Sequence, residues 1–571
     1  MIINTWNRLT GACFCMFIAG LLPLTVYAKT FEVRDTDDLP DINPGDGRCE
    51  TTTLGCTLRA AIMELNRTFE PNDRIILRAG VYRLTIPPVT RSFPLADDGD
   101  LYLGHSQPLE IIGDDANTTV IEQTVEDRVM QIGGGADVSI SSVTFRGGRA
   151  VETRREGGFS KSEGGGLAIA GDVHLNQIIV TGNQAVGGGG IAAHVSSGRL
   201  RIENTVIENN EATETGGGIG FIAPYPGSGT LELRDSIIDS NRAGTKGGGL
   251  SFAGRGEKLD IAYTKITNNR AGSGETEPCY CDGGGIFYKT VYPRYSSDIE
   301  SRRRDRNGRI IDTLIRGNAA YRGGGIYQYG FDPLLVERIL IAENRAKDGG
   351  GMVVRGPIDI TNSTFSGNVA EFGGAIAGQF NPAGILGTDI RVRNAIDLHN
   401  TTIADNQAIF GSGIFTNSDK FSVSARGTIF ANLPQERNCN LAGRSALNSL
   451  DSNLDSGLSC DLSGANDLID MNPRLIPLRD NGGFTETHAL RPSSPAIDSN
   501  YTPYCGGFDQ RRAARPAGRT CDIGAFELGA EVLRRPIEGS GESFIYWLGE
   551  PVDVWTYFLF NPLAGGNGYR Y

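Results

Sequence analysis

The sequence predicts an all-β protein, a single-stranded right-handed parallel β-helix (a solenoid) with an N-terminal capping helix and a disulfide-stapled C-terminal cap. The main observation is a unit built on Asn-x-Ala and a following glycine-rich tripeptide, which recurs eight times between Val173 and Phe415. A period of about 24 to 40 residues in a polar chain indicates stacked supersecondary units rather than one globular core. The apolar runs between the turns are also short and β-branched, which favours strands over helices.

Each repeat resolves into strands and corners. When the copies are aligned on the asparagine, the residues three and eight positions earlier are apolar in every copy. Six positions earlier the residue is mostly Asn or Asp, with Gln177, Tyr263 and Arg338 as departures. We therefore expect a strand, an Asx-Ser/Thr corner, a second strand, the Asn-x-Ala corner, the glycines and a third strand. Stacking would join the asparagine amides in a structural ladder: Asn183, Asn210, Asn241, Asn269, Asn318, Asn344, Asn368 and Asn406.

The glycine tripeptides are interpreted as structural. They recur in every unit, and none has the Lys-Ser/Thr that follows a phosphate-binding loop. Three successive glycines therefore indicate positive φ or a close backbone approach. About a dozen coils spaced by about 4.8 Å would form a rod of about 60 Å, whose two open ends need caps.

The N-terminal cap is expected to contain a short amphipathic helix between Cys56 and Asn66. Leu58, Ala61, Ile62 and Leu65 recur at helical spacing, which gives the helix one apolar face. The same pattern places Arg59 and Glu64 on the solvated side. The first strands are expected over residues 75–85 and 109–112.

Three segments resemble known families. The run from Cys56 to Asn66, with Asp46-Gly47 and Cys49 upstream, resembles the CSLREA domain of bacterial secreted proteins, although Thr57 and Ala60 depart from its name motif. Residues 473–527 are similar to the choice-of-anchor Q domain, through Asp480-Asn481-Gly482-Gly483, Ser494-Pro495-Ala496-Ile497-Asp498 and Cys521-Asp522-Ile523-Gly524-Ala525-Phe526-Glu527. The repeats resemble those of chlamydial polymorphic outer-membrane proteins, whose two tetrapeptides are matched by Phe365-Ser366-Gly367-Asn368 and Gly373-Gly374-Ala375-Ile376. The resemblances imply a secreted or surface β-helix of pectin- or pectate-lyase-like fold, and no particular reaction.

The expected organisation has five parts. Residues 1–28 read as a signal peptide, because an apolar run from Ala12 to Val26 precedes a small-residue cleavage site at Ala28. Residues 29–100 form the CSLREA-like cap and first strands, 101–435 the β-helix repeats, 436–527 the choice-of-anchor Q-like region and 528–571 an aromatic tail. We expect an exported monomer, extracellular or at the bacterial cell surface or outer membrane, without a transmembrane span in the mature chain.

Cysteine usage agrees with export. Outside the signal peptide the eight cysteines fall into four local pairs, expected as disulfides: Cys49 with Cys56, Cys279 with Cys281, Cys439 with Cys460, and Cys505 with Cys521. No metal site is predicted, because Cys279 and Cys281 lack nearby partner ligands and the five histidines show no metal-ligand spacing. A formal net charge of −13 argues against nucleic acid as a partner.

Binding is the function that the sequence favours, as a secreted or cell-surface adhesin-like or glycan-binding protein whose partner is a polysaccharide or a cell or matrix surface. The alternative is a polysaccharide lyase or glycoside hydrolase on acidic polysaccharide, and no catalytic residues are assigned for it. No cofactor is expected, apart from Ca²⁺ under the lyase alternative. Three or more acidic residues beside a basic one in a groove would favour the enzyme, whereas Asn, Gly and hydroxyl groups would favour binding.

Insertions between repeats are the expected binding loops, because loops on one face of a solenoid carry specificity. One is residues 272–282, with the cysteines at 279 and 281. The other, residues 289–309, supplies the candidate ligand-binding residues Tyr292, Arg294, Tyr295, Arg302, Arg303, Arg304 and Arg306. In the C-terminal cap, Asp509, Arg511, Asp522 and Glu527 are expected to form a buried structural ion-pair network.

Overall fold

The structure is a computed structural model, which describes residues 28–532 apart from 69–70, 90–95, 151–154, 157–158, 161, 196–197, 223–228, 273–278, 280, 291–307, 331–332, 380–394, 420, 433–436, 444–446 and 503–504. The expected signal peptide, except for Ala28, and residues 533–571 of the tail therefore lie outside the described residues. Within the described part of the chain, no helix is long and apolar enough to cross a membrane.

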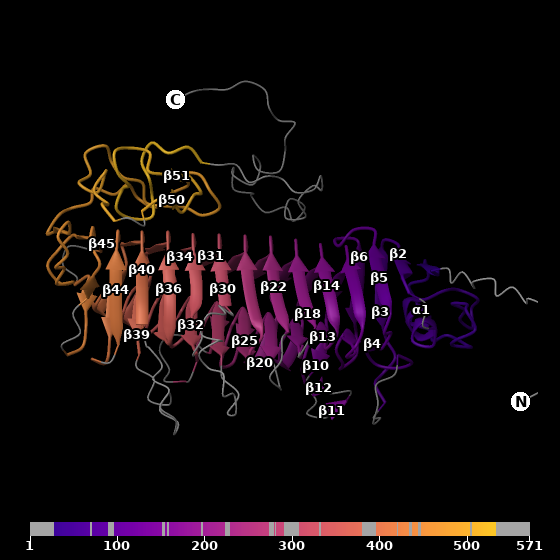
Figure 1. Cartoon of the computed structure of the whole chain (residues 1–571). Helices are drawn as coiled ribbons and strands as arrows, with labels where there is room; N and C mark the ends of the chain where they lie inside the picture. The colour runs from indigo at the N-terminus through magenta and orange to yellow at the C-terminus, as the bar shows by residue number, and fades with distance from the viewer. Residues whose placement is uncertain are drawn as a thin grey trace, which may run out of the picture.

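The chain coils into a right-handed parallel β-helix, which confirms the predicted fold class (Figure 1). Each coil passes along four sides of the rod, and we number the sheets 1 to 4 in that order. Three of them, sheets 1, 2 and 4, are long parallel sheets that run the length of the rod. Sheets 1 and 2 each contain 14 strands, and sheet 4 contains 12. At about 4.8 Å per coil, 14 stacked strands give a rod of about 60 Å.

The strand bounds follow in stacking order. Sheet 1 comprises β1 (Thr30–Val33), β2 (Asp73–Leu77), β5 (Pro108–Gly113), β8 (Asp137–Ser141), β14 (Asp172–Asn176), β18 (Arg199–Glu203), β22 (Thr230–Arg234), β26 (Lys258–Ala262), β30 (Gly308–Ile311), β33 (Leu334–Glu337), β36 (Pro357–Thr361), β40 (Ala395–His399), β44 (Ser422–Arg426) and β47 (Asn448–Ser449). Sheet 2 comprises β3 (Gly80–Leu84), β6 (Thr119–Gln123), β9 (Thr144–Arg146), β15 (Ile179–Thr181), β19 (Val206–Glu208), β23 (Ile237–Asp239), β27 (Lys265–Thr267), β31 (Leu314–Arg316), β34 (Leu340–Ala342), β37 (Thr364–Ser366), β41 (Thr402–Ala404), β45 (Ile429–Ala431), β48 (Leu454–Asp455) and β49 (Leu468–Ile469). Sheet 4 comprises β4 (Leu101–Leu103), β7 (Met130–Ile132), β13 (Leu167–Ile169), β17 (Ile191–Ala193), β21 (Ile219–Ile222), β25 (Leu250–Gly254), β29 (Ile286–Thr290), β32 (Ile326–Tyr329), β35 (Met352–Arg355), β39 (Ile376–Gly378), β43 (Ile414–Thr416) and β46 (Cys439–Asn440).

A fourth side, which the repeat pattern did not predict, follows the Asn-x-Ala corner. Sheet 3 consists of β10 (Arg149–Ala150), β16 (Gln184–Gly187), β20 (Glu211–Thr215), β24 (Arg242–Ala243) and β28 (Arg270–Ala271), and further along the rod β38 (Val369–Phe372) pairs with β42 (Gln407–Phe410). Two hairpins complete the strands, β11 (Arg155–Glu156) with β12 (Phe159–Ser160) and β50 (Gly507–Phe508) with β51 (Ala514–Arg515).

Backbone geometry explains the repeat. The residue six positions before each asparagine has a positive φ in all eight copies, including the departures Gln177, Tyr263 and Arg338. In the glycine tripeptides the first glycine has a positive φ, as at Gly323, where φ is 64°. The second glycine provides the close approach, because a Cβ on Gly324 would lie 2.4 Å from the carbonyl oxygen of Gly350 in the next coil. Each tripeptide thus turns the chain from sheet 3 into sheet 4.

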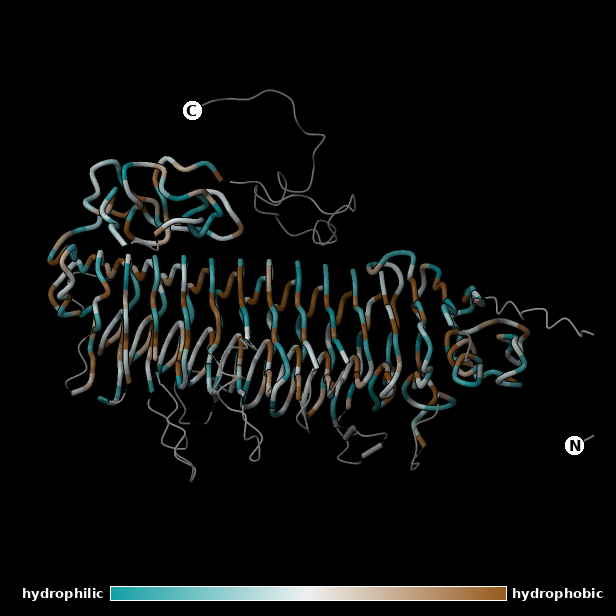
Figure 2. The backbone as a smooth tube through the Cα atoms, viewed as in Figure 1, coloured by the Kyte–Doolittle hydropathy of each residue, from teal (hydrophilic) through white to brown (hydrophobic). Residues whose placement is uncertain are grey.

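Inside the rod, Ile, Val, Leu and Phe side chains from sheets 1, 2 and 4 form one continuous apolar core. Apolar and polar stretches alternate around each coil (Figure 2). The eight ladder asparagines are also interior, each at most 1% exposed. The Nδ2 of each donates to the Oδ1 of the asparagine in the next coil at 2.8–3.1 Å, and the ladder continues to Asn432 and Asn438.

The N-terminal end of the rod is covered by helix α1 (Leu58–Leu65), whose N-cap Thr57 accepts a hydrogen bond from the Ala60 amide at 3.1 Å. The prediction that Arg59 and Glu64 face solvent is wrong, because they are 1% and 0% exposed. Arg59 forms an ion pair with Asp38, and the Glu64 carboxylate accepts hydrogen bonds from two backbone amides of the preceding segment, at positions 45 and 47. The helix is therefore enclosed on both sides, by the rod end and by the preceding segment.

The C-terminal region folds back along the outer side of sheet 2, where β50 and β51 lie above the strands near the end of the rod (Figure 1). Polar contacts fasten it over several coils. Arg512 pairs with Asp312 at 2.7 Å, Thr364 donates to Gln510 at 2.6 Å, and the Asn500 amide donates to Asn400 at 2.9 Å. This cap covers sheet 2 between β31 and β45 and leaves the faces of sheets 3 and 4 to other contacts.

Candidate functional site

The structure divides the predicted site residues into three groups. The ladder asparagines are in the core, where they cannot meet a ligand. The eight paired cysteines are disulfide-bonded. The predicted ligand-binding residues of the insertion lie outside the described residues: Tyr292, Arg294, Tyr295, Arg302, Arg303, Arg304 and Arg306.

The disulfides join the pairs that the sequence suggests, and three of the four lie in the terminal regions: Cys49 with Cys56, Cys439 with Cys460, and Cys505 with Cys521. The fourth, between Cys279 and Cys281, lies beside Asp282. Cys439 is in β46, and Cys460 follows 21 residues later, beyond β48. Both side chains are buried, and the Cys460 amide donates to the Asp455 carboxylate at 3.0 Å. This bond therefore closes the last coils of the rod, and Cys460 has a structural role and no place in a ligand site.

A cluster of charged and aromatic side chains lies on the outer face of sheet 4 and the adjoining edge of sheet 3, over strands β25 to β39. One row of it occupies the position just before each glycine tripeptide. Consecutive coils there present Lys246, Asp282, Arg322 and Asp348, joined in parallel register from coil to coil. The row is therefore a line of alternating positive and negative side chains parallel to the rod axis.

A second row lies on sheet 4 itself, on the outward side of the strands. Phe287 and Tyr327 stack with their ring centroids 5.6 Å apart and are 5% and 2% exposed. Two residues further along each strand come Lys289, Tyr329 and Arg355, again paired from coil to coil. We call the two rows together the cation–aromatic face, with Tyr321 and Lys347, which lie beside the first row. The rows comprise Lys246, Asp282, Arg322 and Asp348, and Phe287, Tyr327, Lys289, Tyr329 and Arg355.

Cations lie over the rings of this face. Five contacts of this kind have distances of 5.3–5.7 Å from the cation to the ring centroid: Lys246 over Phe287, Lys289 over Tyr329, Arg322 over Tyr327, Lys347 over Tyr321 and Arg355 over Tyr329. A ring quadrupole attracts a cation at such distances and holds it without neutralising its charge. The rings thus position positive charges at the surface of a protein whose formal net charge is −13.

Hydrogen bonds order the centre of the face. Arg322 donates to both carboxylate oxygens of Asp282, from Nε at 2.7 Å and from Nη2 at 3.1 Å. Arg355 Nη1 donates to the Tyr327 hydroxyl at 2.8 Å, and the Gln379 amide donates to Asp348 Oδ2 at 2.8 Å. A bidentate pair such as Arg322–Asp282 fixes the guanidinium plane as well as its position.

Burial dominates the electrostatics of the acidic groups. It raises the pKa of the Asp282 carboxyl despite the hydrogen bonds and charge of Arg322, and it raises the pKa of the Asp348 carboxyl despite the bond from Gln379. Burial and the charge of Asp282 also raise the pKa of the Tyr327 hydroxyl, which remains protonated at neutral pH. Burial opposes the charge of Arg322, but the contact with Asp282 outweighs it and raises the pKa of the guanidinium.

The sequence carried a signal for this face that the repeat analysis passed over. Read along the repeats, the residue before the first glycine is Thr215, Lys246, Asp282, Arg322 and Asp348 in successive coils. Four successive charges of alternating sign in stacked coils predict ion pairs between neighbouring coils, as Arg322 forms with Asp282.

A hollow elsewhere on the rod is also lined by charged groups. A hollow of about 330 Å³ lies on sheet 1 between Arg74, Glu110 and Asp137, but Arg74 and Glu110 form an ion pair and no aromatic residue lines it. In the part of the chain that the structure describes, no group of three or more His, Cys, Asp or Glu residues is arranged to hold a metal ion.

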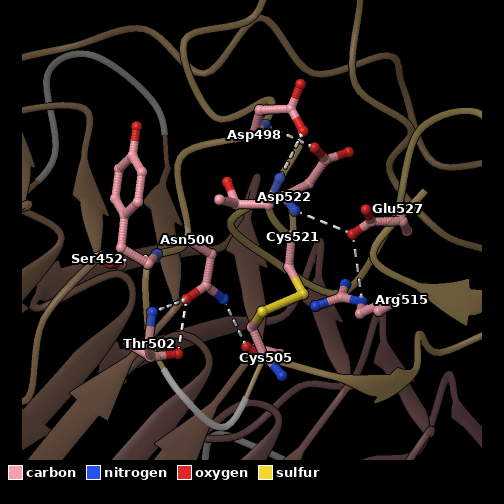
Figure 3. Close-up of a disulfide and its surroundings, with 12 residues drawn as sticks. Ser452, Asp498, Asn500, Thr502, Cys505, Arg515, Cys521, Asp522 and Glu527 are labelled. Atoms are coloured by element: carbon pink, nitrogen blue, oxygen red, sulfur yellow. Dashed lines mark hydrogen bonds and ion pairs between the residues drawn. A yellow bond between two sulfur atoms is a disulfide. The ribbon is translucent and has the colours of Figure 1, made fainter. Parts of the chain in front are cut away.

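The C-terminal cap contains the ion-pair network expected there. Asp509 and Arg511 pair at 2.6 Å with both side chains buried, and Arg515 approaches Glu527 at 3.6 Å. The carboxylates of Asp522 and Glu527 also accept backbone hydrogen bonds, beside the disulfide that links positions 505 and 521 (Figure 3). Asp509, Asp522 and Glu527 find these partners within their own segment of the cap, so the network is structural.

His488 links the cap to the rod and gives the assembly a pH dependence. Its Nδ1 donates to the Ile476 carbonyl at 2.9 Å, so its Nε2 is left to accept from the Ser366 hydroxyl of β37 at 2.9 Å. Burial lowers the pKa of this imidazole despite the charges of Asp405 and Glu486, and the ring is neutral in the folded protein. Since the unfolded chain takes up the proton more readily, stability is present above the unfolded pKa of about 6.5 and is lost as the pH falls from there toward the folded value.

We therefore expect the free energy of unfolding to fall between pH 7.5 and pH 5.5, by up to about 1.4 kcal/mol per pH unit from this one proton. The unfolding temperature should fall with it. His488→Gln should lower stability at pH 7.5 and flatten the slope, because it removes the buried imidazole. Thermal unfolding followed by circular dichroism at both pH values measures this. An unchanged slope in His488→Gln would mean that other groups set the acid sensitivity.

Comparison with known proteins adds similarity of shape alone. No protein-family model matches the sequence, and no curated protein matches it. Among solved structures, pectate lyase Pel9A aligns with a TM-score of 0.35 and 13% identity over 88% of this chain and 97% of that one. The PL6 family alginate lyase AlyGC aligns with a TM-score of 0.42 and 11% identity over 76% of this chain and 54% of that one. The A-module of the Azotobacter vinelandii mannuronan C-5 epimerase AlgE6 aligns with a TM-score of 0.43 and 13% identity over 74% of this chain and 99% of that one. These values transfer no activity to this chain.

Proposed function

We propose that the protein is exported and binds an acidic polysaccharide through the cation–aromatic face. The observation that carries the proposal is the set of five cations held over aromatic rings between Lys246 and Arg355, in a chain of net charge −13. Carboxylate groups of a polysaccharide are complementary to such a local positive surface. The four disulfides support export, because such bonds persist in oxidising compartments.

The resemblances to CSLREA and choice-of-anchor Q domains fit the same proposal, since they imply a secreted or surface protein. Accessibility fits as well. The side chains of Arg322 and Lys347 are 18% and 38% exposed, so the charged groups that lie over the rings are still partly accessible from the surface. The cap occupies sheet 2, on another side of the rod, and does not compete for this face.

A hydrolase is the second candidate, and the spacing of Asp282 and Asp348 favours it. The two carboxylates are two coils apart, about 9.6 Å at about 4.8 Å per coil. This separation is at the upper limit for inverting glycosidases, which hold their carboxyl groups about 6.5–9.5 Å apart. Binding remains the stronger proposal because Asp282 is 4% exposed and bound on both oxygens by Arg322, which leaves it poorly placed to activate water.

Two matched double variants test the binding proposal. Lys246→Ala/Lys289→Ala removes two cations from the face, and Lys258→Ala/Lys265→Ala removes two from sheets 1 and 2, with the same change in net charge. We expect the first to weaken binding of sodium polygalacturonate about tenfold at low salt, about 1.4 kcal/mol, and the second to change it little. Equal affinities for the two variants, measured by calorimetry, would remove the face from the binding account.

Turnover separates the two candidates. The unaltered protein is incubated with polygalacturonate, alginate and a neutral glucan, with Ca²⁺ or with EDTA. Unsaturated ends detected by ultraviolet absorbance would identify a lyase, and new reducing ends alone would identify a hydrolase. For the binding proposal we expect neither product above a heat-inactivated control, with retention of the polymer by the protein.

A further inference from the structure

Four of the five cations of the cation–aromatic face lie in its two rows, and these four form a lattice with one cation in each coil; the fifth, Lys347, lies beside the first row, next to Asp348. In the row before the glycines, cations and carboxylates alternate as Lys246, Asp282, Arg322 and Asp348. Parallel strands repeat at about 4.8 Å, so Lys246 and Arg322 lie about 9.6 Å apart along the rod.

The second row has the opposite phase. On sheet 4, Ala253, Lys289, Tyr329 and Arg355 pair from coil to coil in that order. Lys289 therefore shares a coil with Asp282, and Arg355 shares a coil with Asp348. The first-row cations Lys246 and Arg322 share their coils with the uncharged Ala253 and Tyr329. Successive coils thus offer a cation on one side, then on the other.

The lattice has defined ends. Before Lys246 the first row holds Thr215, and after its last aspartate it holds Phe372. The second row begins with the uncharged Ile222, one coil before Ala253. The alternating cations therefore cover four successive coils, from the lysine of the first row to the arginine of the second, about 14 Å apart along the rod.

We propose that this face binds a contiguous run of about four 1,4-linked uronate units lying parallel to the rod axis, one unit per coil, with carboxylates on alternate sides. This rests on the proposed function and names its ligand more closely. In an extended 1,4-linked polyuronate with two-fold symmetry, each sugar is turned over relative to the last, so its carboxylates alternate between the two edges of the chain. A pyranose unit is about as long as the separation of adjacent coils, about 4.8 Å, so the alternation matches the two rows.

The acidic residues of the first row disfavour chains whose carboxylates do not alternate in the same order as the cations. In the coils of Lys289 and Arg355, the opposite row holds Asp282 and Asp348, so a carboxylate on the wrong edge would face a like charge. A chain lying across the rod would meet the cations of one coil only. A polymer in which a neutral sugar separates the uronates presents its carboxylates at every second unit, and so reaches one of the two rows.

Binding of length-defined oligosaccharides tests the inference, with the full mature protein and calorimetry at low salt. We expect affinity for oligomannuronates to rise steeply from the disaccharide to the tetrasaccharide and to level off beyond it. A hyaluronan oligosaccharide of the same total length, which alternates uronate with a neutral sugar, should bind at least about tenfold more weakly than the tetramannuronate.

Variants at one end of the lattice test the direction of the chain. A disaccharide spans two of the four coils and can bind at Arg322 with either neighbouring cation without reaching Lys246, whereas a tetrasaccharide spans all four coils. Lys246→Ala should therefore weaken tetramannuronate binding about tenfold and leave the affinity of the disaccharide within about twofold. Lys258→Ala, on sheet 1, is the control and should change neither affinity.

The outcomes separate this inference from the function on which it rests. Binding of no acidic glycan at all would overturn the proposed function. Binding that does not depend on chain length, or that is equally tight for hyaluronan, would overturn the lattice and leave a general polyanion surface. Equal losses for the di- and tetrasaccharide in Lys246→Ala would contradict a chain that lies along the rod with one unit in each of the four coils.

Discussion

Replacing Asn318 with aspartate is expected to destabilise the middle of the rod. Asn318 is fully buried, and its Nδ2 donates to the Ile266 carbonyl at 2.9 Å and to Asn344 Oδ1 at 3.0 Å. Its Oδ1 accepts from the Nδ2 of Asn269 at 3.1 Å. Aspartate keeps the acceptor but loses both donors, so a carboxylate oxygen would face two other acceptors in the core.

The expected penalty is about 3–5 kcal/mol, the usual effect of leaving a buried charge uncompensated. In a solenoid each unit is stabilised by its neighbours, so damage at one coil weakens the coils on both sides. Urea unfolding measures the loss. Asn318→Ala, which removes the same bonds but adds no charge, should be less destabilising, and Asn117→Asp, on an exposed turn, should unfold like the unaltered protein. An Asn318→Asp midpoint equal to that of Asn117→Asp would show that the ladder contributes little.

The architecture could be predicted because every coil of a β-helix needs the same types of residue at the same positions. The asparagines that end as the ladder, the apolar residues that fill the core and the glycines that turn the chain each recur at fixed offsets. Sheet 3 was not predicted because some of its strands are only two residues long, as in Arg242–Ala243, and such a strand has no period to detect.

Arg59 and Glu64 show why the burial of charged residues on a helix could not be predicted from the sequence. A helical pattern identifies the apolar face, but it does not show what covers the opposite face. Here the segment that contains Asp38 and Gly47 wraps over α1, so the two charged side chains are buried with partners 17 to 21 residues away in sequence. Only the folded chain brings those partners together.

The cation–aromatic face could not be identified from the sequence alone. Lys246, Asp282, Arg322 and Asp348 are spaced 26 to 40 residues apart, so no local motif contains two of them. Their proximity follows from stacking alone, which means that the fold must be known before the position preceding each glycine tripeptide can be read as one surface. The same reading applied to the other outward positions shows aromatic rings beneath the cations, as at Phe287.

Arg322→Met is expected to have two separable effects, on stability and on binding. Asp282 is 4% exposed and both of its carboxylate oxygens accept from Arg322, so removing the guanidinium leaves a buried carboxylate without its principal partner. Loss of one member of a buried pair costs about 3–5 kcal/mol at neutral pH. Since burial already raises the pKa of Asp282, the carboxyl takes up a proton more easily than usual, and the loss should shrink as the pH is lowered.

The double variant Arg322→Met/Asp282→Leu distinguishes structure from function. Replacing both charges with apolar side chains of similar size is often neutral for stability, so we expect most of the lost unfolding free energy to return. Binding of polygalacturonate should remain at least about tenfold weaker, because the cation at the centre of the lattice is still absent. As a control, Arg234→Met breaks a partly exposed pair with Asp260 on sheet 1, where the stability loss should be at most about 1 kcal/mol and binding should be unchanged. Recovery of binding together with stability in the double variant would show that Arg322 serves the fold alone, and that the ligand is held by the remaining cations of the face.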